Sequence, residues 1–312
     1  MLSDTARRIV ENVKKVIVGR DEVVELAVIA LLCEGHVLIE DVPGIGKTTL
    51  AKTVARSLGC SFQRIQFTPD LLPSDVTGIY YFNQKQQDFE FRAGPVMAQV
   101  VLADEINRAT PRTQAALLEA MQERQVTIDG NTMLLPRPFL VLATQNPIEL
   151  EGTFPLPEAQ IDRFLLKIKL GYPTEQEESD ILIRFERTDP LVGLKPVVNP
   201  DELLQMQAAV RQMRVEDSVR MYIVRVARAT REHPAVSLGV SPRGTMALYR
   251  TAQARAAMRG RDFVIPDDVK VLAPYVLTHR IIISSQTRLR GRTTEEVVME
   301  VVDQVPVPVE TL

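Results

Sequence analysis

The chain has 312 residues, of which 45% are apolar and 25% are charged, and these fractions are typical of a globular protein with about two domains. Its net charge of −3 and pI near 5.8 provide no overall electrostatic attraction to nucleic acid or to an anionic membrane. The longest apolar stretch, residues 23–33, contains Glu25 and is too short to span a bilayer, and we expect no signal peptide in the first residues.

The first part of the chain combines helical patterns with one apolar strand. Ile9, Val13 and Val16 recur at helical spacing behind Asp4, which can cap the helix. In chain order we expect helices over 4–17 and 22–32, a strand over 37–40, a loop over 41–49 and a helix over 50–58. A strand, a glycine-rich loop and a helix in this order are the context that a phosphate-binding loop requires.

The loop and the residue before it read Glu-Asp-Val-Pro-Gly-Ile-Gly-Lys-Thr-Thr. Gly44 and Gly46 allow backbone N–H groups to point inward around an anion, and the following helix adds partial positive charge. Lys47 can reach the outer phosphates of a nucleotide, and the Thr48 hydroxyl can ligate Mg²⁺. Asp41 departs from the strict pattern, which has glycine there, and the alternative is a chance turn with a surface lysine. The residues expected to bind nucleotide here are Asp41, Val42, Pro43, Gly44, Ile45, Gly46, Lys47, Thr48 and Thr49.

The middle of the chain predicts two hairpins between further strands. Residues 79–82 and 89–91 are short β-prone runs on either side of a polar tip, within a stretch over 68–94 that prolines and a glycine interrupt. Such an inserted hairpin is expected to be a contact element. The other elements expected here are strands at 62–67, 100–105, 139–144 and 165–170, helices at 111–124 and 157–164, and a hairpin at 125–128 and 132–135.

After residue 173 nearly every segment has helical periodicity. Helix starts are indicated at Asn199-Pro200, Ser241-Pro242 and Ile265-Pro266, because proline is favoured at the first helical position. We therefore expect a helical second domain, with a tail at 305–308 that is extended or mobile.

Two acidic residues, Asp104 and Glu105, end the apolar strand at 100–105. Buried carboxylates are costly unless they face a cation or a polar cleft, and ligands bind at the carboxyl ends of parallel strands. Asp104 is placed to hold Mg²⁺ through water, and Glu105 to polarise a water for attack on a γ-phosphate. Asn146 ends the neighbouring strand and can hold that water. The alternatives are ordinary surface carboxylates, and an asparagine that forms a turn before Pro147.

These motifs resemble those of AAA+ ATPases, and more closely those of the MoxR family. The supporting segments follow the family order over nearly the whole chain: residues 38–49, 67–75, 103–108, 144–147, 156–164 and 241–243. The resemblance implies a P-loop NTPase core, α/β with a parallel sheet between helices, over residues 1–188, and a small all-α lid over 189–312. The stretch 68–94 then corresponds to a helix-2 insert, and 125–136 to the hairpin before sensor 1.

The resemblance also implies ATP and Mg²⁺ as cofactors and a role for each candidate residue. The matches are Lys47 and Thr48 to Walker A, Asp104 and Glu105 to Walker B, Asn146 to sensor 1, Arg163 to the arginine finger, Arg243 to sensor 2, and Val18 and Gly19 to the adenine contact. Thr48 and Asp104 are the expected metal ligands.

The roles expected for the arginines have alternatives. Arg163 is expected to act on the nucleotide of the neighbouring subunit, and a salt bridge with Asp162 or Glu158 is its alternative. Arg108 and Arg112 are competing candidates for the finger, since both follow Walker B. In part of the AAA+ subgroup that carries a helix-2 insert, sensor 2 acts in trans, so Arg243 can belong to the site of either subunit.

The resemblance implies a ring, expected to be a hexamer. The local motifs themselves predict hydrolysis of ATP to ADP and phosphate, and we expect a cytoplasmic protein. The resemblance also implies a chaperone-like role in assembling protein complexes or inserting metal cofactors. A client protein and a von Willebrand factor A-domain protein are the partners it implies. Cys33 and Cys60 lack the spacing of a metal site or a disulfide, which fits a reducing cytoplasm.

Two other functions are considered as alternatives to an ATPase with a chaperone-like role. A motor stimulated by nucleic acid is disfavoured because the hairpin tips carry little positive charge, Lys85 on the first and none at 129–131 on the second. A nucleotide-gated binding module with little turnover is disfavoured by Glu105 and Asn146, which such a module does not need.

Overall fold

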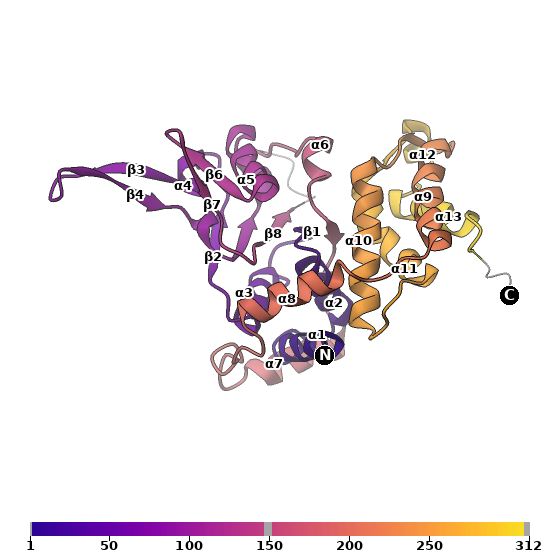
Figure 1. Cartoon of the computed structure of the whole chain (residues 1–312), viewed down its shortest axis with the longest axis horizontal. Helices are drawn as coiled ribbons and strands as arrows, with labels where there is room; N and C mark the ends of the chain where they lie inside the picture. The colour runs from indigo at the N-terminus through magenta and orange to yellow at the C-terminus, as the bar shows by residue number, and fades with distance from the viewer. Residues whose placement is uncertain (1, 147–151, 309–312) are drawn as a thin grey trace.

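The computed structural model describes residues 2–146 and 152–308, and its centre is a parallel sheet of five strands in the order β2-β5-β8-β1-β9 (Figure 1). The strands are β1 (Val37–Glu40), β2 (Phe62–Gln66), β5 (Val100–Asp104), β8 (Leu140–Gln145) and β9 (Leu166–Ile168). Strands β1, β5 and β8 are almost entirely buried, as expected for parallel strands that are covered on both faces. The predicted parallel α/β core is confirmed.

Helices pack on both faces of this sheet. Leu102 of β5 belongs to the apolar cluster of α1 (Leu2–Lys14), α2 (Asp21–Leu32) and α3 (Lys47–Ser57). Its neighbours Val101 and Ala103 belong to the other cluster, with α5 (Pro111–Glu123) and α4 (Pro73–Thr77). Successive side chains of a strand point to opposite faces, so the same strand anchors both layers.

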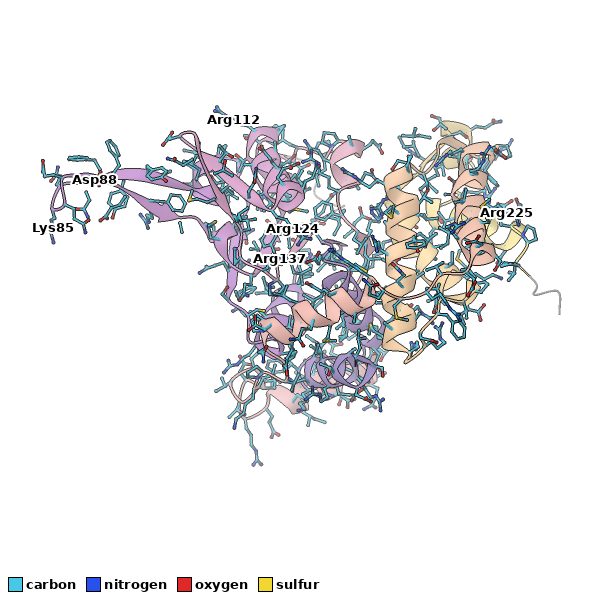
Figure 2. All side chains as sticks on the ribbon, in the orientation of Figure 1. Lys85, Asp88, Arg112, Arg124, Arg137 and Arg225 are labelled. Atoms are coloured by element: carbon cyan, nitrogen blue, oxygen red, sulfur yellow. The ribbon has the colours of Figure 1, made fainter. Side chains whose placement is uncertain are left out.

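The two predicted hairpins are present. Strands β3 (Gly78–Asn83) and β4 (Asp88–Ala93) pair in antiparallel register and form an arm that extends far from the sheet (Figure 1). Lys85 and Asp88 lie at the outer end of the arm (Figure 2). The second hairpin, β6 (Gln125–Ile128) and β7 (Asn131–Leu134), lies beside α5.

The last part of the chain is helical, as predicted. Its elements are α7 (Glu175–Phe185), α8 (Pro200–Val210), α9 (Asp217–Glu232), α10 (Pro242–Met258), α11 (Pro266–Leu277), α12 (Ser285–Leu289) and α13 (Thr294–Gln304), with a small sheet of β10 (Val236–Leu238) and β11 (Ile282–Ile283). The side chains of Asn199 and Ser241 cap α8 and α10. No helix within the described ranges has both the length and the apolar character that crossing a bilayer requires. The domain division at 188 and 189 stays a prediction.

Some predicted bounds differ from the structure. Helix α1 already includes Leu2, so Asp4 lies in its first turn and pairs with Arg7 at 2.9 Å. The helix predicted over 157–164 is the single turn α6 (Glu158–Ile161). Strand β9 ends at Ile168, before the predicted 170, because the backbone N–H of Leu170 donates to the Asp41 carboxylate.

Candidate active site

The loop between β1 and α3 is open on the side that a ligand would occupy. Gly44 and Gly46 have φ of +86° and +93°, a region that glycine adopts readily, and a Cβ placed on either would have no atom within 4 Å. No side chain caps α3, so the first N–H groups of that helix are available to an anion. These features fit a bound phosphate chain.

The phosphate cavity, about 340 Å³, lies over this loop and the carboxyl ends of β5 and β8. Its lining residues are Pro43, Gly44, Gly46, Lys47, Thr48, Thr49, Arg64, Asp104, Glu105 and Asn146. Residues predicted from separate parts of the sequence therefore meet in one place. The predicted site residues outside this lining are Val18, Gly19, Asp41, Val42, Ile45, Arg163 and Arg243.

Lys47 is almost buried and is held by its own loop. Its Nζ donates to the backbone carbonyl of Asp41 at 2.8 Å. Burial lowers the pKa of Lys47, and the negative charges of Asp104, Asp41 and Glu105 act against that shift. The ammonium thus lies among carboxylates at the edge of the cavity, where an incoming phosphate can compete for it.

The carboxylate of Asp104 is fixed from both sides. Its Oδ2 accepts from Nε and Nη2 of Arg64 at 3.1 and 2.6 Å, and its Oδ1 accepts from the Thr144 hydroxyl at 2.6 Å. Arg64 comes from β2, whose Gln66 stands opposite Asp104 in the parallel register. A metal at Asp104 would therefore share this carboxylate with a guanidinium.

Glu105 has the left-handed conformation, with φ of +55°, a strained geometry for a residue other than glycine. Its backbone N–H donates to the Thr144 hydroxyl at 2.8 Å. Its Oε2 accepts from Gln66 Nε2 at 3.1 Å and from Arg108 Nη1 at 3.0 Å. The proposed catalytic carboxylate is thus held at the mouth of the cavity by two donors.

Arg64, Gln66 and Thr144 were not singled out by sequence reasoning. Their positions follow from strand order, since β2 and β8 are the two neighbours of β5. Arg64 and Gln66 are two positions apart in β2 and therefore project from the same face of the strand, and polar residues at this spacing are the signal that could have marked them.

Asn146 follows β8 and is buried, with 6% of its surface exposed. Its backbone carbonyl accepts from Asn107 Nδ2 at 3.5 Å. Its place in the cavity lining agrees with the predicted position beside the phosphates. Pro147, the basis of the alternative turn interpretation, lies outside the described residues.

A second hollow, the arginine cavity of about 370 Å³, contains the two predicted arginines. Its basic lining residues are Arg124, Arg163, Arg243, Arg250 and Arg280, together with His36. The carboxylate of Asp162, predicted as the alternative partner of Arg163, accepts from Arg280 Nε at 2.7 Å and from the Ser241 hydroxyl at 3.2 Å.

The competing finger candidates lie elsewhere. Arg108 pairs with Glu105, and Arg112 is exposed on α5 at the rim of the molecule (Figure 2). The predicted adenine residue Gly19 packs against Glu177 of α7 so closely that a Cβ there would overlap the carboxylate. The roles of these residues remain predictions.

The described residues contain no group of three or more histidine, cysteine, aspartate or glutamate side chains that could bind a metal by themselves. Mg²⁺ in nucleotide sites uses one or two protein oxygens and completes its shell with phosphate oxygens and water. Thr48 and Asp104, which line the same cavity, are a donor set of this kind.

The comparisons with known proteins agree with this geometry. A family model described as "ATPase family associated with various cellular activities (AAA)" matches residues 36–166, and an AAA lid domain matches residues 228–301. The first span contains Lys47, both strand-end carboxylates and Arg163, and the second contains Arg243.

Individual relatives cover almost the whole chain. It is 52% identical to the protein YeaC of Bacillus subtilis (strain 168) over 301 residues, 96% of this chain and 94% of that one. It is 44% identical to Chaperone MoxR1 of Mycobacterium tuberculosis over 313 residues, 97% of this chain and 82% of that one. A crystal structure from Cytophaga hutchinsonii matches with a TM-score of 0.93 at 37% identity, covering 99% and 96% of the two chains. The chain therefore belongs to the MoxR family of AAA+ ATPases.

Proposed function

We propose that the chain hydrolyses ATP at the phosphate cavity and that a neighbouring copy of the chain completes the site. The observation that supports ATP hydrolysis is that one cavity is lined by Lys47, Thr48, Asp104, Glu105 and Asn146. These residues come from the loop before α3 and from the ends of two strands, which is where a parallel sheet binds its ligands.

Each of these residues has its own role in phosphoryl transfer. Thr48 and Asp104 would hold Mg²⁺, which neutralises charge on the phosphates. The N–H groups at the start of α3 bind phosphate oxygens, and Lys47 exchanges the Asp41 carbonyl for the outer phosphates. Glu105 orients and polarises the attacking water, and Asn146 holds that water in line. Positioning of this kind, with electrostatic stabilisation, is most of what this reaction requires.

The arginine cavity lies at the opposite end of β1 from the phosphate cavity. His36, just before β1, lines the arginine cavity, and Pro43, just after it, lines the phosphate cavity. A strand rises about 3.3 Å per residue, so the four residues of β1 separate the cavities by roughly 13 Å. We therefore assign Arg163 and Arg243 to the nucleotide of the next subunit. An arginine supplied in trans can accelerate hydrolysis by ~10³-fold or more.

The client is proposed to be a protein, in keeping with the name Chaperone MoxR1 of the mycobacterial relative. The β3–β4 arm exposes Phe82 and Phe89 by 48% and 65%, so it offers apolar contacts well away from the active site. A hexameric ring in the cytoplasm, a von Willebrand factor A-domain partner, and a role in complex assembly or metal-cofactor insertion complete the proposal. The arm's tip combines Lys85 with Asp88, which gives nucleic acid little to bind.

The test is ATP turnover per subunit as a function of protein concentration, with Mg²⁺ present. Turnover that rises and then reaches a plateau is expected, because each site needs its neighbour. A constant, measurable turnover at all dilutions would show that one subunit suffices and would remove the trans assignment. Glu105→Gln should retain ATP binding and lose hydrolysis, and unchanged hydrolysis would exclude Glu105 from the chemistry.

A mixing experiment tests the contributions of the two cavities separately. Arg163→Ala protein should bind ATP without hydrolysing it, and Lys47→Ala protein should fail to bind it. Mixed rings regain activity, because a Lys47→Ala subunit still donates its arginine to a neighbour that binds ATP. Arg225→Ala is the matched control, since this arginine of α9 is exposed and lines neither cavity, so its loss should change turnover little. Absence of any recovery at every mixing ratio would count against a shared site.

A further inference from the structure

The side chain of Asp41, at the position where the strict loop pattern has glycine, reaches across to the segment after β9. Its Oδ2 accepts from the backbone N–H groups of Leu170 at 2.7 Å and Gly171 at 2.6 Å. Its Oδ1 accepts from the N–H of Val42 at 2.9 Å. A glycine could make none of these bonds, so the departure from the pattern has a structural consequence.

The main chain of Asp41 holds the phosphate loop itself. Its carbonyl accepts from Lys47 Nζ at 2.8 Å, and its N–H donates to the Gln145 carbonyl at 3.1 Å, at the end of β8. One residue therefore touches the lysine expected to bind phosphate and the segment that leads to α7. Any displacement of Lys47 acts directly on the residue that holds Leu170 and Gly171.

The same segment is held on its other side by the chain before α2. Gly171 has φ of +68°, and its carbonyl accepts from Arg20 Nη2 at 3.1 Å. Arg20 Nη1 also binds Oε2 of Glu177 in α7 at 3.1 Å. Residues 170–177, here called the connecting segment, are thus held between the phosphate loop and residues 19–20.

We propose that Asp41 is a positioning residue that couples the phosphate loop to the connecting segment, an inference that rests on the proposed function. Phosphates that bind Lys47 withdraw its ammonium from the Asp41 carbonyl and bring further negative charge toward the Asp41 carboxylate. The first change frees the main chain of Asp41 to move, and the second repels its carboxylate, so that the carboxylate is displaced from Leu170 and Gly171. Nucleotide binding is thereby transmitted to α7 and the helices that follow.

The test is amide hydrogen exchange at Leu170 and Gly171, with and without a non-hydrolysable ATP analogue and Mg²⁺. In the unaltered protein, exchange at these two amides should become about tenfold faster on binding, since a hydrogen bond to a charged group is worth about 10- to 100-fold. In Asp41→Gly, exchange should be fast in both states. Asp41→Asn keeps one acceptor oxygen without the charge, and its exchange should be intermediate in the nucleotide-free protein.

Binding of a fluorescent ATP analogue distinguishes a failure of the proposed function from a failure of the coupling through Asp41. Exchange in Asp41→Gly is compared at analogue concentrations that saturate each protein, so that a difference in affinity does not enter the comparison. Asp303→Asn, an exposed site on α13, is the matched control and should leave the exchange unchanged. Equal, slow exchange in both states of the unaltered protein would mean that Asp41 is only structural and would overturn the coupling. An unaltered protein that binds no analogue would overturn the proposed function and the coupling together.

Discussion

Replacing Asp162 with alanine should destabilise the protein more than any surface carboxylate would. The Arg280 side chain is only 2% exposed, and Asp162 is its ion-pair partner at 2.7 Å. The guanidinium also donates to the carbonyls of Phe164 at 2.5 Å, Leu165 at 3.2 Å and Val276. Burial lowers the pKa of Arg280 to about 10, and Asp162 acts against that shift. Asp162→Ala therefore leaves a buried charge without its counter-charge.

The expected loss follows from that burial. Removing one partner of a buried pair typically costs about 3–5 kcal/mol, and the lower end applies because the Asp162 side chain is 22% exposed. For a domain with a total stability of about 5–15 kcal/mol this is a large fraction. The melting temperature should fall by roughly 10 °C. Turnover should fall as well, because Asp162 also accepts from Ser241, the capping residue of the helix that carries Arg243.

Urea unfolding of three variants measures this effect. Asp162→Ala should shift the free energy of unfolding by about 3 kcal/mol, whereas Asp303→Ala, an exposed control, should stay within about 0.5 kcal/mol. The double variant Asp162→Ala/Arg280→Met should be more stable than Asp162→Ala, because it removes the uncompensated charge. A loss below about 1 kcal/mol in Asp162→Ala, or no recovery in the double variant, would refute the account based on a buried charge.

Three further predictions concern the pH dependence, the catalytic carboxylate and the loop. Burial lowers the pKa of His36 to about 4, so the unfolded chain takes up a proton that the folded chain excludes. Acidification from pH 7 to 5 should therefore cost about 2 kcal/mol of stability through His36, a part of the pH dependence that His36→Gln should lack; equal pH dependence in that variant would contradict this. Gln66→Ala removes one of the two donors to the Glu105 carboxylate. We expect this bond to hold Glu105 back from the attacking water, so basal ATP turnover should rise by up to about tenfold at unchanged ATP affinity; a fall in turnover would show instead that Gln66 positions Glu105 for the reaction. Gly46→Ala meets no steric contact but forces alanine into the left-handed region, so urea unfolding should show a loss of about 1–2 kcal/mol, and an unchanged midpoint would refute strain.

Local patterns in the sequence were enough to locate the phosphate loop and the strand-end carboxylates. The loop is defined within ten residues, and Asp104 and Glu105 end an unbroken apolar run. A turn sequence between two β-prone runs likewise predicts each hairpin without knowledge of the rest of the fold. These features depend on residues that are adjacent in the chain, so the sequence alone is enough to predict them.

The residues that support this site depend on which strands are neighbours. Gln66 reaches Glu105 only because β2 pairs with β5, and no local pattern specifies that pairing. The contact from Asp41 to Leu170 spans 129 positions in the chain. The same holds for the pair of Asp162 and Arg280, which are 118 positions apart. Long-range ion pairs and hydrogen bonds of this kind follow from the fold, whereas apolar periodicity gives only the elements.

Two aspartates hold the chain on either side of β9, and the difference between them suggests how a coupled motion proceeds. Asp162, before the strand, pairs with a buried guanidinium, and separating that pair would leave a charge in the core. Asp41 holds the chain beyond the strand through two backbone N–H groups, which water can replace when the segment opens. If nucleotide binding moves the helical part as proposed, the contact at Asp41 should open first. The pair of Asp162 and Arg280 should stay closed, so that Arg163 and Arg243, which line one cavity, would remain together while the connecting segment beyond β9 moves.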